Sequence, residues 1–415
     1  MHQGIFYGWW IVLVCLLVQV ANAGTAFYSF SVYQHVLPAE FETTATLISL
    51  ATSAYLLSIA LTGPAVGWLT DRYGPRRVLL VGGVIAGAGL CLLSLARTLW
   101  ELYLLYFVVG VGMSGAGAVA TSTVVSNWFV RRRGTAIGVT MIGMSIGALT
   151  MPNLARLVIE TSGWRMSFLV LGLIAWVLVI PGVWFVMKND PRETGLRPDG
   201  MKTVLEQNQD ADPPGDVKSI GVRTPATGFS GATFWLVSIV FFLANIGLSA
   251  VLQHEVNFLT NEALIPFAVA SLALSLTGGI GALGKLVFGH LSDRISSQYA
   301  IMLCFGLQAF GVSLLMFNRV VTVWTFVLVY GFAMGGQYAM QPMVVSDMFA
   351  SSSFGTMLGA FTPAIALGLA VGPFMAAWIY DVTQSYSGAF IIVTALYIVG
   401  MVAMAFARKR KPGWS

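Results

Sequence analysis

Twelve long apolar stretches constrain the fold of this chain more than any other feature of its sequence. A bilayer core of roughly 30 Å is crossed by a helix of about 20 apolar residues. The stretches cover residues 10–35, 47–70, 77–96, 101–127, 134–158, 165–188, 233–259, 265–291, 299–317, 321–346, 354–380 and 386–407. With 57% hydrophobic and 9% charged residues, the chain cannot cover a water-exposed surface. The sequence therefore predicts an all-α integral membrane protein with twelve transmembrane helices.

Several function classes are disfavoured by what the sequence lacks. It contains no nucleotide-binding loop and no nucleophile beside a base, so we expect no enzyme activity and no cofactor. Cys15, Cys91 and Cys304 lie in apolar stretches without metal-ligand spacing and are expected to be buried thiols, not a metal site. The basic residues flank membrane stretches and form no basic domain, which disfavours nucleic-acid binding.

The first stretch is predicted to be helix 1 and not a signal peptide, because it is too long and has no small-residue cleavage site. Most of the 22 lysines and arginines fall on one side of the predicted helices. The positive-inside rule places that side, with both termini, in the cytoplasm. We therefore expect a multi-pass protein of the cytoplasmic (inner) membrane.

One long loop divides the predicted helices six and six. It contains Pro213, Pro214 and many charges, which is typical of a disordered cytoplasmic linker. Its early part, residues 190–200, is rich in turn residues, and both docking on the cytoplasmic face and a simple tether remain open. We predict a six-helix bundle over 1–188, a linker over 189–232 and a second six-helix bundle over 233–415.

An internal repeat supports this division. The segment with Gly67, Asp71 and Arg72 recurs as Gly289, Asp293 and Arg294, and at nearly the same offset Gly134, Thr135 and Gly138 recur as Gly355, Thr356 and Gly359. Such a repeat predicts two parallel six-helix repeats related about the membrane normal. A substrate site is then expected between them.

The loop between predicted helices 2 and 3 contains the most specific motif. Its residues are Gly67, Asp71, Arg72, Gly74, Arg76 and Arg77. Gly67 permits close helix approach, Gly74 makes the turn, and Asp71 can accept hydrogen bonds at a helix N-terminus while the arginines pair with carboxylates. We interpret this cluster as a conformational switch that closes the cytoplasmic side.

This motif resembles the loop signature of the major facilitator superfamily, which implies a major facilitator fold and a transporter. The second copy retains Gly289, Asp293 and Arg294 but has Ser296, Ser297 and Gln298 where the first has a glycine and basic pair. We therefore expect its contact to be weaker.

A finer resemblance extends over nearly the whole chain. It rests on Phe6–Trp10 at the start, Gly163–Arg165 before predicted helix 6 and Gly195–Gly200 after it. These segments resemble bacterial members of the monocarboxylate porter and oxalate-formate exchanger group. The resemblance implies a cation on predicted helix 8 four residues before Gly289, a position that is Lys285 here. Gly281 replaces the proton-linked aspartate frequent in monocarboxylate porters, and Phe361 or a neighbour replaces the second cation of the exchanger.

Lys285 is the residue that bears most directly on a substrate. It lies eight residues inside Asp293, which at ~1.5 Å per residue is near mid-membrane. A bare ammonium there costs roughly 2.5 to 3.5 kcal/mol even on insertion scales, so it must face water, a partner or an anion. We expect it to bind an anionic substrate. Pairing with a backbone carbonyl or Asp347, or snorkelling to the cytoplasmic face, remains the alternative.

Further polar residues at membrane depth are candidates for the same site. They are Asn22, Tyr28, Asn245, His254, Gln337, Tyr338 and Gln341. Each can instead make contacts between helices. Coupling to protons is open, with His35, His254, Glu255 and Lys285 as candidate carriers, and exchange against a counter-anion needs no such carrier.

The sequence thus predicts a secondary active transporter for a small organic anion, favouring a monocarboxylate, that works as a monomer in the lipid bilayer by alternating access. Proton symport and anion exchange are both open. Two alternatives are an exporter of drugs or metabolites and a non-transporting sensor on the same scaffold. An exporter is expected to show a Gly-Pro signature in predicted helix 5, where Gly147 is followed by Ala148.

Overall fold

The computed structural model describes residues 6–199, 231–317, 320–349 and 353–407, and it is helical nearly throughout these ranges. The helices of the first half are α1 (Gly8–Asn22), α2 (Phe30–Glu40), α3 (Ala45–Tyr73), α4 (Pro75–Leu93), α5 (Leu99–Gly115), α6 (Ala118–Trp128) and α7 (Arg133–Pro181). Those of the second half are α9 (Ala232–Asn261), α10 (Phe267–Ser292), α11 (Ser297–Leu315), α12 (Val320–Phe349), α13 (Phe354–Thr383) and α14 (Ser387–Phe406). Most of the predicted linker lies outside the described residues.

Local sequence explains where several helices begin. Thr98 and Glu101 form a capping box before α5, in which each side chain accepts a hydrogen bond from the backbone N–H of the other. Pro75 is the first residue of α4, where its missing N–H costs nothing. Gly74 precedes it with φ of 86°, a conformation that favours glycine.

Two predicted spans are interrupted. Between α1 and α2 the chain forms a π-helical segment, η1 (Ala23–Tyr28), and the N–H of Ser29 donates to the carbonyl of Gly24, 3.2 Å away. Such segments often mark functional positions. The predicted fourth span divides into α5 and α6 near Gly117, while η2 (Gly182–Val186) and η3 (Pro191–Thr194) follow α7.

The element α7 contains two antiparallel helices. Gly163 has φ of 83° inside it, so the helix breaks there. The hydroxyl of Ser167 donates to the carbonyl of Ala155 at 3.2 Å, which places residues on either side of the break next to each other. The chain therefore turns back at Gly163.

Ten segments of the described residues are long and apolar enough to cross a membrane. One of them, Arg133–Val186, contains the reversal at Gly163 and provides two crossings. The 30-residue α12 adds a further long helix. The all-helical membrane fold is thus confirmed, and the structure is consistent with twelve transmembrane helices.

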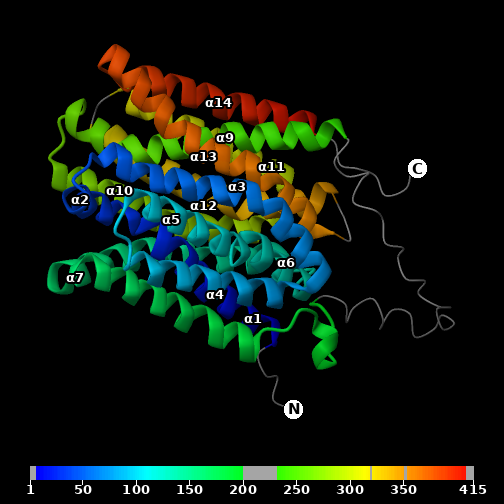
Figure 1. The fold of residues 1–415 in the computed structure, drawn as a ribbon. Coiled ribbons are helices and arrows are strands. Elements are labelled where there is room, and N and C mark those ends of the chain that lie inside the picture. The colour runs from blue at the N-terminus through cyan, green and yellow to red at the C-terminus, as the bar shows by residue number, and fades with distance from the viewer. Residues whose placement is uncertain (1–5, 200–230, 318–319, 350–352, 408–415) are drawn as a thin grey trace.

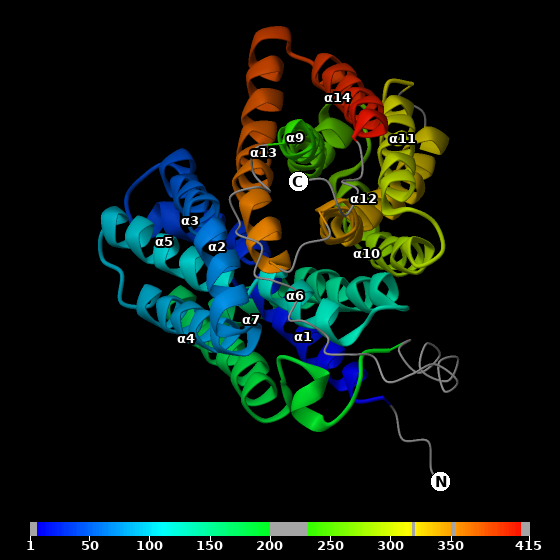
Figure 2. The ribbon, with the colours of Figure 1, turned by 90° about the vertical axis from the view of Figure 1, so that its right-hand side faces the viewer.

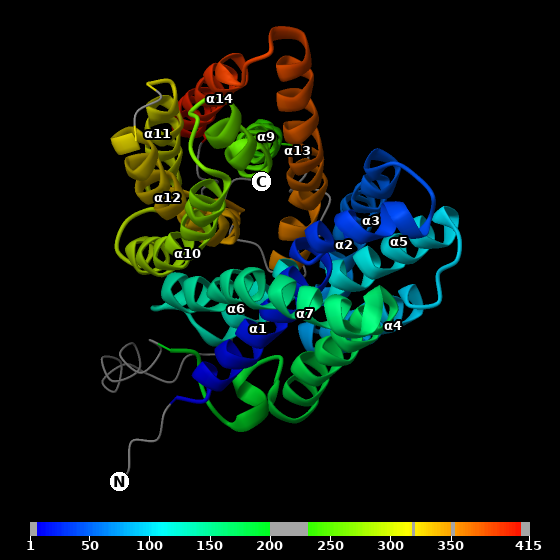
Figure 3. The ribbon, with the colours of Figure 1, turned by 90° about the vertical axis from the view of Figure 1, so that its left-hand side faces the viewer.

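The helices form two groups, α1–α7 and α9–α14, which are seen nearly end on in Figure 2 and from the opposite end in Figure 3. Two helix pairs join the groups: α3 packs along α13, and α7 packs along α10. Both described chain ends lie at the end that faces the viewer in Figure 2. We call this the basic end, because Arg76 at the start of α4, Arg131 just before α7 and Arg294 just after α10 lie there.

Large apolar side chains cover much of the outer surface. Examples are Trp100, Phe185, Phe374 and Phe406, each exposed by more than 70%. A water-soluble protein rarely exposes so many large apolar groups together. The surface fits a multi-pass protein surrounded by lipid.

Candidate functional site

Asp71 fastens the two helix groups together at the basic end. It lies in the last turn of α3, and its carboxylate accepts hydrogen bonds from the backbone N–H of Gly355 at 2.9 Å, the N–H of Thr356 at 2.6 Å and the hydroxyl of Thr356 at 2.6 Å. These groups belong to the first turn of α13, where unpaired N–H groups and the helix dipole favour an anion. We call this contact the first latch.

Asp293 makes the mirror contact between α10 and α7. Its carboxylate accepts from the N–H of Gly134 at 2.6 Å, the N–H of Thr135 at 2.9 Å and the hydroxyl of Thr135 at 2.6 Å. This second latch has the same three kinds of hydrogen bond as the first. The loss of the basic pair from the second motif therefore does not reduce its hydrogen bonding, in contrast to the weaker contact expected from the sequence.

Glycines bring the latched helices into close contact. A Cβ atom on Gly67 would lie 2.3 Å from the carbonyl oxygen of Gly355, and one on Gly289 would lie 2.6 Å from that of Gly134. Real Cβ contacts are longer, so only glycine permits this spacing. The close approach allows the two aspartates to reach the helix N-termini opposite.

The basic residues of the first motif make other contacts than the carboxylate pairs expected from the sequence. The guanidinium of Arg72 lies over the rings of Trp68 and Tyr73, at 5.0 and 5.6 Å from their centroids. The side chain of Arg76 donates to the carbonyls of Val183 and Trp184. Arg77 and Arg294 are exposed.

Residues that follow η2 dock on the loops of the basic end. The carboxylate of Asp199 accepts from the N–H groups of Val130, Arg131 and Arg132, just before α7. The side chain of Asn189 accepts from the N–H of Arg76 at 2.9 Å. Of the two possibilities for residues 190–200, the structure shows docking for the part that it describes.

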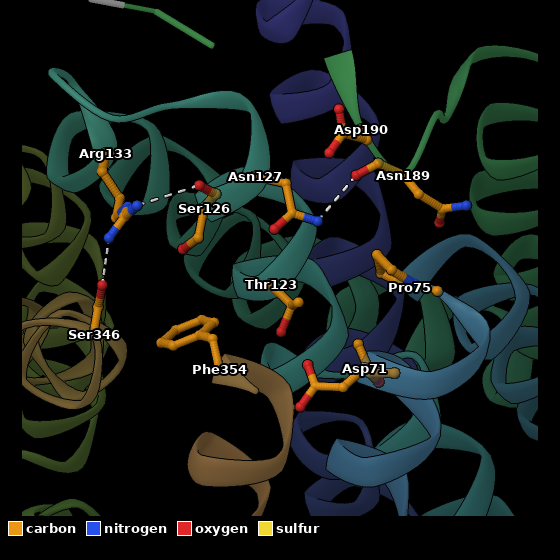
Figure 4. A pocket seen from close by; sticks show the side chains of 12 residues that line it. Asp71, Pro75, Thr123, Ser126, Asn127, Arg133, Asn189, Asp190, Ser346 and Phe354 are labelled. Carbon is orange, nitrogen blue, oxygen red and sulfur yellow. Dashed lines mark hydrogen bonds between the residues drawn. The ribbon is translucent and has the colours of Figure 1, made fainter. Parts of the chain in front are cut away.

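A cavity of about 620 Å³ lies between the helix groups at the basic end. Its lining is mostly polar and includes Asp71, Thr123, Asn127, Arg133 and Ser346. Figure 4 shows Arg133 reaching from the start of α7 to Ser346 on α12, to which it donates a hydrogen bond. Except for Asp71 and Gly74, the sequence motifs did not identify these residues, because they meet through tertiary packing alone. Arg133 could have been noticed in the sequence, because it is the last of three consecutive arginines.

Lys285 lies between the helix groups and is almost completely buried, with 3% of its surface exposed. Its Nζ donates to the Oγ of Ser145 on α7 at 2.6 Å and lies 5.5 Å from the ring centroid of Tyr338 on α12. No carboxylate of the described residues lies within ion-pair distance of it. Asp347, a possible partner from the sequence, instead accepts from the N–H of Ser297.

The polar candidates divide into two groups. Tyr338 lies beside Lys285, and Gln337 and Gln341 are buried nearby in sequence on α12. The Nε2 atoms of both glutamines, like the Oδ1 of Asn245, have no hydrogen-bond partner in the structure. Asn22 and His254 instead tie helices together. Tyr28 ends η1, with its ring edge-on to that of Phe27.

The Nδ2 of Asn22 donates to the carbonyl of Met113 at 2.7 Å. The Nε2 of His254 lies 3.0 Å from the carbonyl oxygen of Pro373, and its Nδ1 lies 3.2 Å from the hydroxyl of Tyr386. Burial raises the pKa of the Tyr386 phenol above its ordinary value, so the phenol is a neutral donor. A neutral imidazole that donates through Nε2 and accepts through Nδ1 satisfies both contacts.

Comparison with known proteins gives a consistent result. The family model described as Major Facilitator Superfamily matches twice, over residues 14–261 and 232–415. The oxalate:formate antiporter of Oxalobacter formigenes is 25% identical over 96% of this chain and 90% of its own. Monocarboxylate transporter 12 of Rattus norvegicus is 26% identical over 98% of this chain and 86% of its own.

A solved structure has the same fold. The proton:xylose symporter XylE, bound to 6-bromo-6-deoxy-D-glucose, matches 97% of this chain and 96% of its own with a TM-score of 0.73. The sequence identity is 16%, so this likeness concerns the fold and not the substrate.

Proposed function

Because the chain belongs to the Major Facilitator Superfamily, we propose that it is a secondary transporter that moves a small organic anion across the membrane by alternating access. The observation that carries this proposal is the buried, unpaired ammonium of Lys285 between the two helix groups. Both relatives described above are named for anionic substrates, oxalate and formate in one case and monocarboxylates in the other.

The surroundings of Lys285 leave room for an anion as partner. One hydrogen bond to Ser145 leaves most of its donor capacity unused, because an ammonium has three N–H donors. An unpaired charge at membrane depth costs roughly 2.5 to 3.5 kcal/mol or more. A carboxylate bound at Nζ reduces this cost, whereas a neutral or cationic solute does not.

Neighbouring groups complete the proposed site. The unpaired amide nitrogen of Gln341 is a donor for a second carboxylate oxygen, and the ring of Tyr338 covers the ammonium. Gln337, whose Oε1 accepts from the Nε2 of Gln308 on α11 at 3.0 Å, is proposed to contribute its unpaired Nε2. Asn245 on α9 and Tyr28 at the end of η1 in the other helix group are proposed as further contacts. Asn22 and His254 act mainly by holding helices, with substrate contact as a secondary role.

The position of the latches supports alternating access. Both connect the helix groups at the basic end, as expected of a carrier that is closed at that end. Opening it requires that Asp71 and Asp293 leave the helix N-termini, together six hydrogen bonds. We propose that Gly67, Arg72, Gly74, Arg76, Arg77, Gly289 and Arg294 support the same switch.

We also propose an orientation and a domain division. The basic end faces the cytoplasm, in accordance with the positive-inside rule, so that both chain ends are cytoplasmic and the protein lies in the inner membrane. The bundles correspond to 1–188 and 233–415 with the linker 189–232 between them. The transporter works as a monomer.

Counterflow into proteoliposomes tests the proposal. The vesicles are loaded with unlabelled solute and exposed to radiolabelled lactate, pyruvate, acetate or oxalate, with glucose as a neutral control. We expect uptake of at least one anion and none of glucose. Lys285→Ala should reduce uptake of the anion ten- to a hundredfold, because a hydrogen bond to a charged group contributes about 1.5–3 kcal/mol.

Two further variants serve as controls. Lys285→Arg keeps the charge and should retain part of the uptake, whereas Arg156→Ala removes an exposed cation paired with Glu160 and should have no effect. Uptake of a neutral solute that survives Lys285→Ala would refute the anion proposal.

A further inference from the structure

A second buried ionisable group lies in the same helix group as Lys285. Glu255 on α9 is completely buried. Its Oε1 lies 3.0 Å from the hydroxyl oxygen of Thr277 on α10, and its Oε2 has no hydrogen-bond partner among the residues that the structure describes. No cation of the described residues lies within ion-pair distance. An ionised carboxylate in this position is strongly unfavourable.

The contacts of the Thr277 hydroxyl bear on whether Glu255 is protonated. Two oxygens lie 3.0 Å from it, the carbonyl of Ala273 and the Oε1 of Glu255. A threonine hydroxyl has a single proton to donate. If Glu255 is protonated and donates to the Thr277 hydroxyl while Thr277 donates to the carbonyl of Ala273, each contact has its own proton. The observed arrangement therefore fits a protonated carboxylic acid.

We propose that Glu255 is the binding site of a proton that is transported together with the anion. This inference rests on the proposed function and deepens it, because it selects proton symport over anion exchange. Glu255 was one of four carriers that the sequence left open. Of the other three, His254 has both ring nitrogens in helix contacts, His35 is exposed, and Lys285 faces Ser145.

The groups around Glu255 leave the carboxyl without a competing charge. Of the helices that pack against α9, α10 has Lys285 and, in its last turn, His290, and α14 has Tyr397; on α9 itself His254 precedes Glu255. Tyr330 on α12 is within electrostatic reach of Glu255, and its hydroxyl lies 3.2 Å from that of Tyr397 on α14. On α13 the titratable residues are Tyr380 and Asp381, near the C-terminal end of the helix.

Lys285 is the nearest cation along the helix that Glu255 contacts. It follows Thr277 by eight residues on α10, which corresponds to about 12 Å. Thr277, Gly281 and Lys285 all belong to the buried face of this helix. A change in the position of α10 therefore affects both groups together.

Charge balance couples the two sites. With Glu255 protonated, as the observed arrangement fits, and no anion at the ammonium of Lys285, one net positive charge is buried, which is costly in the membrane. A monovalent anion bound at Lys285 neutralises this charge, so the carrier that holds the proton binds the anion more strongly than the deprotonated carrier. Release of the anion alone restores the buried charge, whereas release of the anion together with the proton leaves no net charge. One proton and one monoanion therefore cross together, without net charge movement.

Proton-driven accumulation tests this inference. Proteoliposomes with an inside pH one unit above the outside should accumulate the transported monoanion about tenfold, since the gradient provides about 1.4 kcal/mol. We expect Glu255→Gln to reduce the accumulation ratio to about one while counterflow remains within a few-fold of the parent. Glu262→Gln is the matched control, because Glu262 follows the last residue of α9 and its carboxylate accepts hydrogen bonds from Ser385 and Tyr386 outside the membrane-spanning helices.

The outcomes separate this inference from the proposed function. Tenfold accumulation in Glu255→Gln, or dependence on a sodium gradient in place of the pH gradient, overturns the role of Glu255 and leaves anion transport intact. Loss of counterflow together with accumulation in correctly folded Glu255→Gln also overturns it. Failure of the anion proposal has a different signature, since no anion then shows counterflow even in the parent.

Glu255→Asp provides a second variant that keeps an ionisable group. We expect it to retain accumulation with a shifted pH dependence, because its shorter side chain changes the contact with Thr277. A pH dependence identical to that of the parent overturns the assignment.

Discussion

Replacement of Asp71 by asparagine tests whether the first latch holds the basic end closed. The two carboxylate oxygens accept three hydrogen bonds from Gly355 and Thr356. Asparagine keeps a single acceptor oxygen, and its NH₂ group faces an N–H donor whichever way the amide is turned. The variant therefore loses at least one charge-assisted hydrogen bond and gains an unfavourable contact.

The free energy that favours the closed state over the open state should fall by about 2 kcal/mol. A hydrogen bond to a charged group contributes about 1.5–3 kcal/mol, and the lower part of this range applies because Asp71 is exposed to the cavity at the basic end. Such a shift changes the ratio of open to closed molecules about 30-fold. If about 1% of the parent is open at this end, roughly a quarter of the variant is open.

Distance measurements between spin labels detect this change. Position 131 in the first half and position 299 in the second are exposed at the basic end, and the labels are placed in a protein without Cys15, Cys91 and Cys304. We expect a second, longer distance in Asp71→Asn. In transport assays, turnover should fall more than the half-saturation constant changes, because Asp71 acts in the switch and not in binding.

Two comparisons make this prediction specific. Asp293→Asn should produce a shift within about threefold of that of Asp71→Asn, because its hydrogen bonds are equivalent. Asp190→Asn should leave the distances unchanged, since Asp190 lines the same cavity but its carboxylate contacts Arg192 in its own loop. An unchanged distance distribution and turnover in Asp71→Asn would refute the latch.

Two more predictions concern packing at the same end. Gly67→Ala should lower the midpoint of thermal unfolding by a few degrees, because its Cβ would overlap the carbonyl of Gly355 and overpacking costs about 1–3 kcal/mol; Gly278→Ala, which has open space around it, is the control, and equal midpoints contradict the argument. Asp199→Ala should speed tryptic cleavage at Arg131 and Arg132, whose N–H groups lose their acceptor. Arg197→Ala changes an exposed residue nearby and should not speed cleavage at Arg131 and Arg132. Equal cleavage rates in the two variants contradict a docking role for Asp199.

The sequence predicted the fold because its strongest signals are local or repeated. Apolar length gave the spans, and the equal offsets of the two motifs related Asp71 to Asp293 and Gly134 to Gly355. Each aspartate in fact contacts the glycine segment of the other half. The repeat thus anticipated which segments correspond, although it did not show that they touch.

Features that depend on tertiary packing were not predictable in this way. The bond between Glu255 and Thr277 joins residues on two helices, and nothing in either segment marks the other as its partner. The cavity residues Thr123, Asn127 and Ser346 are ordinary polar residues until the helices are assembled. The break of the first span at η1 likewise has no glycine or proline pattern distinct from that of intact helices.

The seam between α7 and α10 includes both the second latch and the backbone of Lys285, since a Cβ on Gly138 would lie 2.4 Å from the Lys285 carbonyl oxygen. The amides proposed to sense the shape of the solute, those of Gln337 and Gln341, are on α12 instead. The requirement for an anion, carried by Lys285, is thus on the same helix as the second latch, whereas recognition of the solute's shape is assigned to α12. Substitutions on α12 can therefore change which anion is carried while the charge requirement and the latch on α7 and α10 stay as they are.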